Sequence, residues 1–181
     1  MNNPVQVVVM GVSGCGKTTV TKGLAAALSL EMVDGDDLHL PQSVSKMRSG
    51  QALEDTDRWP WLERIGRYLA QAPDNSIGRV VACSALKRAY RDQIRRMAPR
   101  ARFVFLDGTP ELIGQRLALR TGHYMPPDLL HSQFQTLERP DASESDVSTL
   151  SVAGTADQVL AAAVQRVRGF MSSEGQALEL R

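Results

Sequence analysis

The chain has 181 residues, 43% of them hydrophobic, and a formal net charge of +1. Its length predicts one compact domain, and so small a net charge offers no strong field for nucleic acid or an anionic membrane. Its two cysteines, Cys15 and Cys83, lack metal-ligand spacing, and the first residues show no signal-type segment, so we expect a reduced, cytoplasmic compartment.

The first strand candidate is the apolar run at residues 5–10, and it leads into a glycine-rich loop. Residues 11–18 read Gly-Val-Ser-Gly-Cys-Gly-Lys-Thr, which fits the Walker A or P-loop pattern, and a helical pattern follows at about 16–29. Glycines let the backbone turn its N–H groups inward as an anion nest, to which the helix dipole adds. We therefore expect ATP to be held by Gly11, Val12, Ser13, Gly14, Cys15, Gly16, Lys17, Thr18 and Thr19.

Two residues of this loop have expected chemical roles. Lys17 should reach the β- and γ-phosphates, and the Thr18 hydroxyl should ligate Mg²⁺. A glycine-rich turn that fits the pattern by chance is the alternative, and the flanking strand and helix argue against it.

The second strand candidate, residues 31–34, is followed by the acidic segment Asp34-Gly35-Asp36-Asp37. Two carboxylates two residues apart on an extended segment point the same way. Beside a phosphate loop, one can organise Mg²⁺ and the other can accept a proton from an attacking hydroxyl group. We assign Asp34 to the metal shell and Asp36 to the acceptor hydroxyl; an acidic turn without chemistry is the alternative.

Residues 35–56 are long for a mere connection, and we interpret them as part of a pocket for an acceptor substrate. Helical patterns near 57–72 and 86–98 then flank a third strand candidate at residues 79–83. Basic residues recur between Arg88 and Arg102. A solvated helix face explains them more simply than an RNA site, so we expect no nucleic-acid partner.

A fourth strand candidate at residues 102–107 precedes a helical pattern at about 109–121, which places Arg116 and Arg120 on one face. Because phosphoryl transfer depends on charge neutralisation, we expect Arg120 at the γ-phosphate and Arg116 over the nucleotide base. A solvated helix face is the alternative. Residues 120–141, with a helical pattern at about 126–138, are expected to form a lid.

The last strand candidate is residues 147–152, and the last helical pattern covers about 155–171. We expect a single domain over residues 1–171 and a flexible tail over 172–181. The alternation of strands and helices predicts an α/β fold with a parallel sheet, helices on both faces, and ligands at the carboxyl ends of the strands. No apolar run approaches membrane-spanning length, so no membrane partner is expected.

Five further sequence blocks stand out along the chain. They are Asp34-Gly35-Asp36-Asp37-Leu38-His39, Lys46-Met47, Asp57-Arg58-x-Pro60-Trp61-Leu62, Cys83-Ser84-Ala85-Leu86-Lys87-x-x-Tyr90-Arg91-Asp92 and Gly122-His123-Tyr124-Met125-Pro126. Together, and in this order, they resemble the gluconate kinases (gluconokinases) of the P-loop small-molecule kinase group, and the similarity runs from about residue 5 to residue 138. One departure is Leu40, which stands before Pro41 where the family has proline directly after the histidine.

The resemblance implies a three-layer P-loop fold with strand order 2-3-1-4-5, a helical lid and a homodimer. It also implies transfer of the γ-phosphate of ATP to the 6-hydroxyl of D-gluconate, giving 6-phosphogluconate. The carboxylate and hydroxyl groups of such an acceptor call for cationic and acidic partners. The residues expected to bind it are Asp36, His39, Arg58, Lys87, Arg91 and His123. For Arg58 and Arg91 the alternative is pairing with nearby acids.

Two other classes of function fit parts of the sequence: another small-molecule kinase, for shikimate or a nucleotide, and a nucleotide-binding switch. Shikimate kinases share the acidic pair but usually carry adjacent glycines before a later strand-to-helix turn, and this chain has no adjacent glycine pair. A nucleotide kinase would need a second base pocket, which we do not identify. A nucleotide-binding switch, the rival from another class, would not need Asp34 and Asp36 beside its phosphate loop.

Overall fold

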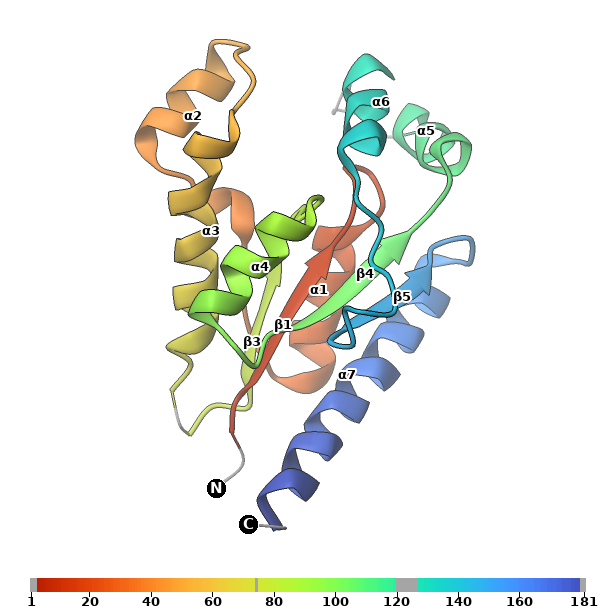
Figure 1. Cartoon of the computed structure of the whole chain (residues 1–181). Helices are drawn as coiled ribbons and strands as arrows, with labels where there is room; N and C mark the ends of the chain where they lie inside the picture. The colour runs from red at the N-terminus through yellow and green to blue at the C-terminus, as the bar shows by residue number, and fades with distance from the viewer. Residues whose placement is uncertain (1–2, 74, 120–126, 180–181) are drawn as a thin grey trace.

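The computed structural model describes residues 3–73, 75–119 and 127–179 (Figure 1). Its strands all run parallel and form one sheet in the order β2-β3-β1-β4-β5. Their bounds are β1 Val5–Met10, β2 Glu31–Asp34, β3 Gly78–Ala82, β4 Arg102–Asp107 and β5 Val147–Ser151. The parallel sheet predicted from the alternation, and the strand order implied by the resemblance, are both confirmed.

Helices connect the strands and cover both faces of the sheet. They are α1 Lys17–Leu28, α2 Pro41–Arg48, α3 Asp55–Ala70, α4 Arg88–Met97, α5 Pro110–Ala118, α6 Pro127–Thr136 and α7 Ala156–Glu179, with a 3₁₀ helix, η1, at Gly35–Leu38. In Figure 1, α1 packs beside α7 on one side of the sheet, and α3 packs beside α4 on the other. None of the described helices is both long and apolar enough to cross a membrane.

The central strand shows why this sequence needs two helical layers. Val5, Val7 and Val9 belong to the core under α1 and α7, whereas Val8 and Met10 belong to the core under α3 and α4. Successive side chains of a strand point to opposite faces, so a strand that is covered on both sides is apolar at every position. Full burial of each such side chain contributes about 1.5–3 kcal/mol.

Two segments differ from the sequence prediction. Residues 41–48, which belong to the segment interpreted as an acceptor pocket and for which no helix was predicted, form α2. This helix begins with Pro41 in its first turn, where the missing N–H group has no cost. The last helix was predicted to end near residue 171, but α7 continues to Glu179. Good helix formers are frequent over residues 174–179, which explains the extension.

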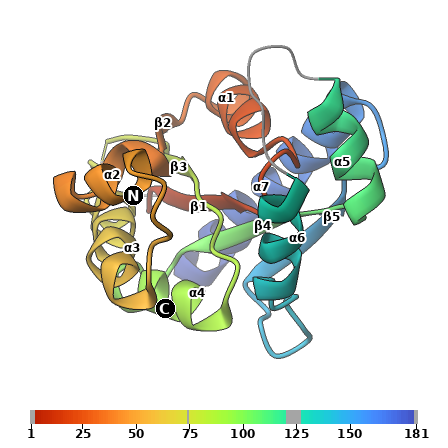
Figure 2. The same ribbon diagram turned by 90° about the horizontal axis from the view of Figure 1, so that it is seen from above.

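The carboxyl ends of β1, β2 and β3 lie at one edge of the sheet and lead into the segments that carry polar side chains. Figure 2, which views this edge from above, places α2 and α6 on opposite sides of the end of β1. Because parallel strands bring their carboxyl ends together, residues that are far apart in the sequence meet there.

Candidate active site

The phosphate loop has the backbone that its sequence predicts. Gly11, Gly14 and Gly16 have φ values of 143°, 82° and 101°, which L side chains rarely adopt. At Gly11 a Cβ atom would also lie 2.8 Å from Leu106 O, so this position requires glycine for space as well as for conformation. Directly after Gly16, α1 begins at Lys17 and turns its first N–H groups toward the loop.

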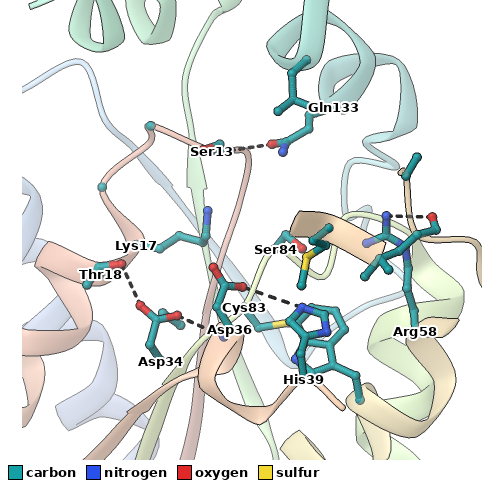
Figure 3. A pocket seen from close by; sticks show the side chains of 18 of the residues that line it. Ser13, Lys17, Thr18, Asp34, Asp36, His39, Arg58, Cys83, Ser84 and Gln133 are labelled. Atoms are coloured by element: carbon teal, nitrogen blue, oxygen red, sulfur yellow. Dashed lines mark hydrogen bonds and ion pairs between the residues drawn. The ribbon is translucent and has the colours of Figure 1, made fainter. Parts of the chain in front are cut away.

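A cavity of about 640 Å³ opens beside this loop. It is built from the loop, the ends of β2 and β3, the segment after α2, and one face of α6 (Figure 3). Its walls consist of Ser13, Gly14, Gly16, Lys17, Thr18, Thr19, Asp34, Asp36, His39, Met47, Gly50, Gln51, Ala52, Leu53, Arg58, Trp61, Ala82, Cys83, Ser84, Leu129 and Gln133.

Asp34 joins the phosphate loop to the acidic segment. Its Oδ2 accepts a hydrogen bond from Thr18 Oγ1 at 3.2 Å, and its Oδ1 accepts one from Asp36 N at 3.2 Å. The sequence argument placed both carboxylates on an extended segment, and this is wrong: Asp34 ends β2 as the N-cap of η1, and Asp36 lies inside η1. Both side chains still face the cavity, because the 3₁₀ turn folds Asp36 back over the strand end.

The charge around Asp36 matters for proton transfer. Its side chain is 88% exposed, although it lines the cavity. Partial desolvation by the surrounding protein and, next in size, the negative charge of Asp34 raise the pKa of its carboxyl group. Lys17 and His39 oppose this rise. A carboxylate with a raised pKa is a better proton acceptor than an ordinary aspartate, provided that it remains ionised.

His39 is held against the indole ring of Trp61. The ring centroids are 4.2 Å apart with an interplanar angle of 13°, and Trp61 Nε1 donates to Gly35 O at 2.6 Å. Burial lowers the pKa of His39, so its neutral form is favoured, and Nε2 lies 4.0 Å from Asp36 Oδ1. Trp61 belongs to the core under α3 and α4 and also lines the cavity.

Arg58 lines the cavity, whereas Lys87 does not. Arg58 Nη2 donates to Leu53 O at 3.2 Å, which leaves much of its guanidinium group turned to the cavity (Figure 3). Lys87 Nζ donates to both carboxylate oxygens of Asp55, at 2.9 and 2.8 Å, and Asp55 also accepts from the Tyr90 hydroxyl. Lys87 is therefore an ion-pair partner in this structure.

Arg91 does not bind in the cavity, and the prediction that it contacts the acceptor is wrong. It is fully buried, and its Nη2 and Nε donate to Oε1 and Oε2 of Glu144 at 2.5 and 2.7 Å. Its Nη1 donates to Ala85 O and Leu86 O. The pairing alternative therefore holds for this residue. Arg91 N donates to Lys87 O one turn earlier, as helical spacing predicts, but the Arg91 side chain turns to Glu144 and not to the cavity.

Arg116 Nη2 donates to Val152 O and Gly154 O, beside the turn that follows β5, and Arg116 does not line the cavity. Arg120 and His123 lie outside the described residues, as does the first part of the predicted lid, residues 120–126. Gly11, Val12 and Cys15 form the buried underside of the loop, and burial raises the pKa of the Cys15 thiol.

The oxygen groups at Thr18 and Asp34 suit Mg²⁺. This ion prefers oxygen ligands, retains several waters and is commonly bound through one or two carboxylates together with substrate phosphates. Among the described residues there is no cluster of three or more His, Cys, Asp or Glu that could hold a metal alone. A site shared between Thr18, Asp34 and a nucleotide fits both facts.

Sequence reasoning missed the contribution of α6. Gln133 and Leu129 line the cavity from this helix, and Gln133 Oε1 accepts a hydrogen bond from Ser13 N. The predicted lid helix included both residues, but its pattern alone does not tell which face meets the loop. Met47 and residues 50–53, which also line the cavity, lie within the segment predicted to form an acceptor pocket.

A phosphate loop on the central strand of such a sheet, with an acidic pair and an open cavity beside it, defines a P-loop kinase for small molecules. Residues 7–140 match the AAA domain family.

Curated relatives and a solved structure then define the family. The chain is 47% identical over 137 residues to the gluconokinase of Gluconobacter oxydans (strain 621H), covering 76% of this chain and 77% of that protein. It is 43% identical over 145 residues to the thermosensitive gluconokinase of Escherichia coli (strain K12), covering 80% and 78%. A crystal structure of a gluconokinase from Sinorhizobium meliloti 1021 superposes with a TM-score of 0.82 at 39% identity, covering 99% of this chain and 98% of that chain. The chain belongs to the gluconokinase family.

Proposed function

We propose that this protein transfers the γ-phosphate of ATP to the 6-hydroxyl of D-gluconate, giving 6-phosphogluconate and ADP. The observation that carries the proposal is the placement of Asp36 in the same cavity as Lys17, with Asp34 bonded to both Thr18 and Asp36. The names of the relatives support the choice of gluconate as the acceptor.

The phosphate end of the cavity supplies the charge neutralisation that phosphoryl transfer needs. Main-chain N–H groups of the loop and the start of α1 hold the β-phosphate, and Lys17 neutralises charge between the β- and γ-phosphates. In this structure Lys17 Nζ donates to Val12 O at 3.0 Å, a contact that a phosphate oxygen can replace. Thr18 and Asp34 would hold Mg²⁺, which would further neutralise the phosphate oxygens during transfer.

Asp36 orients the acceptor and takes its proton. The 6-hydroxyl oxygen forms a bond to the γ-phosphorus while the bond between that phosphorus and the β,γ-bridging oxygen breaks, and the hydroxyl proton passes to Asp36. The electron pair of the broken bond stays on ADP. Figure 3 shows Asp36 beside Lys17 in the cavity, so a hydroxyl group bound to Asp36 lies near the expected γ-phosphate position.

The acceptor end of the cavity contains the cationic and hydrogen-bonding groups that a sugar acid requires. Arg58 lines the cavity and would bind the carboxylate, because a guanidinium group can make two parallel hydrogen bonds to it. His39, neutral and stacked on Trp61, offers a donor near Asp36. Lys87 would bind the acceptor as well if its ion pair with Asp55 were replaced by one with the acceptor carboxylate. Three roles expected from the sequence remain part of the proposal. Arg116 covers the nucleotide base, Arg120 binds the γ-phosphate, and His123 binds the acceptor.

Several further points complete the proposal. Assembly as a homodimer rests on the resemblance alone. Use of Mg²⁺ rests on the oxygen groups of Thr18 and Asp34, and residence in the cytoplasm rests on the cysteine usage. A lid over residues 120–141, a single domain over 1–171 and mobility of the last residues rest on segment length and composition.

An acceptor panel tests the function. Purified protein with ATP and Mg²⁺ is offered D-gluconate, related sugar acids, shikimate and nucleoside monophosphates, and ADP release is followed together with the phosphorylated product. We expect turnover with D-gluconate and a product phosphorylated at the 6-position, and no turnover by Lys17→Ala. Faster turnover with shikimate or a nucleotide would overturn the acceptor assignment, and binding of ATP without any turnover would favour the nucleotide switch.

A further inference from the structure

A side chain of α6 reaches the phosphate loop from 120 residues further along the chain. Gln133 Oε1 accepts a hydrogen bond from Ser13 N, with an N···O distance of 2.6 Å. Figure 3 shows the carboxamide of Gln133 turned toward Ser13. It thereby occupies a main-chain donor of the loop, and such donors otherwise serve to bind anions.

The position of this contact on the loop indicates which phosphate it concerns. Val12 directly precedes Ser13, and its carbonyl oxygen accepts from Lys17 Nζ at 3.0 Å. The Gln133 contact therefore lies at the end of the loop to which the Lys17 amino group reaches, as Figure 3 also shows. The lysine of a P-loop contacts the β- and γ-phosphates of the nucleotide. The Gln133 carboxamide would therefore lie next to the terminal phosphate of a bound triphosphate.

The chemistry of a carboxamide suits this place. Ser13 N–H can only donate, so the atom that faces it is the amide oxygen, and the two hydrogens of Nε2 are directed elsewhere. Within the residues that the structure describes, Nε2 has no hydrogen-bond partner. Leu129, one turn earlier on α6, lines the same cavity, so this face of the helix is turned to the nucleotide side.

We propose that Gln133 is a γ-phosphate-binding residue that lets the protein distinguish ATP from ADP. With ATP bound, Nε2 donates to a γ-phosphate oxygen, and the amide oxygen keeps or releases Ser13 N–H. With ADP bound, this donor has no partner on the nucleotide, and the carboxamide returns to the loop alone. The inference rests on the proposed function only in taking ATP as the phosphate donor.

Two substitutions separate donation to the γ-phosphate from a merely structural contact. Gln133→Glu keeps the shape and the acceptor for Ser13 N–H, but replaces the donor with a negative charge. Gln133→Met keeps similar bulk without either hydrogen-bonding function. Gln135→Glu is the matched control, because Gln135 lies on the same helix, is exposed and bonds only to His131 among the described residues.

The measurement is calorimetric binding of ADP and of a non-hydrolysable ATP analogue, each with Mg²⁺ and without acceptor. Loss of a charge-assisted hydrogen bond predicts that Gln133→Met lowers the ratio of analogue affinity to ADP affinity by about 10-fold. Gln133→Glu should lower it further, because its charge repels the γ-phosphate, and Gln135→Glu should leave it within about 2-fold of the wild type.

An unchanged ratio in both Gln133 variants would overturn the proposal, since a contact that only braces the loop affects both nucleotides alike. A rise in affinity for both nucleotides would also overturn it, by showing that Gln133 merely competes with phosphate. If Gln133→Met unfolds early in a thermal melt, the near-isosteric Gln133→Glu decides the question. Wild-type protein that binds the analogue but does not phosphorylate gluconate would refute the proposed acceptor and leave this inference standing.

Discussion

Replacing Arg91 with methionine tests whether this residue stabilises the fold or binds substrate. The side chain is 1% exposed and donates four hydrogen bonds, two to Glu144 and two to the carbonyl oxygens of Ala85 and Leu86. Methionine fills most of the same volume but supplies none of these donors. Glu144, itself 2% exposed, would then keep Arg95 as its cationic partner.

The size of the effect follows from the burial of both partners. Removing one member of a buried ion pair costs about 3–5 kcal/mol, because the remaining charge stays away from water with too few partners. For a domain of this size, each kcal/mol corresponds to about 2–4 °C in the melting temperature. We therefore expect the melting temperature of Arg91→Met to fall by about 6–20 °C.

The assay combines thermal unfolding with steady-state kinetics below the melting temperature of the variant. Arg96→Met is the matched control, since Arg96 lies on the same helix, is exposed and bonds only to Gln93 among the described residues. Such a surface change is expected to stay within about 0.5 kcal/mol. The KM for gluconate should be close to the wild-type value in both variants.

A raised KM for gluconate with an unchanged melting temperature would refute this reasoning and restore Arg91 as a substrate ligand. If Arg91→Met does not fold, the pH dependence of the stability of Glu144→Gln tests whether the ion pair between Arg91 and Glu144 stabilises the fold. Burial raises the pKa of Glu144, but hydrogen bonds from Arg91 and Arg95 outweigh burial and lower it. A lowered pKa gives stability that is present above the ordinary glutamate pKa and is lost as the pH falls. Glu144→Gln should therefore lose less stability on acidification than the wild type.

Three other predictions concern the cavity. Asp36→Asn should reduce kcat about 10²–10⁴-fold and change ATP affinity little, whereas Asp37→Asn, its exposed neighbour, should retain activity; near-normal turnover by Asp36→Asn would exclude the proton-acceptor role. Because the pKa of Asp36 is raised in the free protein, the acid limb of the kcat/KM–pH profile should have its midpoint above the ordinary aspartate value of about 3.9; a midpoint at or below that value would mean that another group limits the rate. Cys15 is buried with a raised pKa, so native protein should react with iodoacetamide more slowly than denatured protein, and a modified loop should lose ATP binding; fast labelling, or labelling without effect, would show a more open loop.

The sequence predicted those parts of the site whose chemistry is local. The phosphate loop needs only eight consecutive residues, and its glycines have the positive φ values that the pattern requires. The sheet was also predictable, because alternating apolar strands and amphipathic helices leave few other arrangements. Asp34 and Asp36 were placed correctly in the cavity, although through a 3₁₀ turn instead of an extended strand.

Long-range partners were beyond sequence reasoning. Arg91 was expected in the acceptor pocket because nothing in its own segment reveals Glu144, which lies 53 residues further along the chain. Gln133 was missed for the same reason, since its contact with Ser13 exists only when α6 packs over the loop. Lys87 has a long-range partner as well, since its ion pair with Asp55 joins residues 32 positions apart in the sequence.

The strand order has a consequence for how the chain is made. β1 pairs with β3 and β4, and both of these follow it in the sequence. During translation, β1 (residues 5–10) therefore remains unpaired until β3 (residues 78–82), and later β4 (residues 102–107), have been synthesised. An unpaired segment of this apolar kind is prone to aggregate, and non-local parallel pairing is slow. The strand that carries the nucleotide loop is thus the one most exposed to misassembly during translation, and chaperone binding to nascent chains should concentrate there.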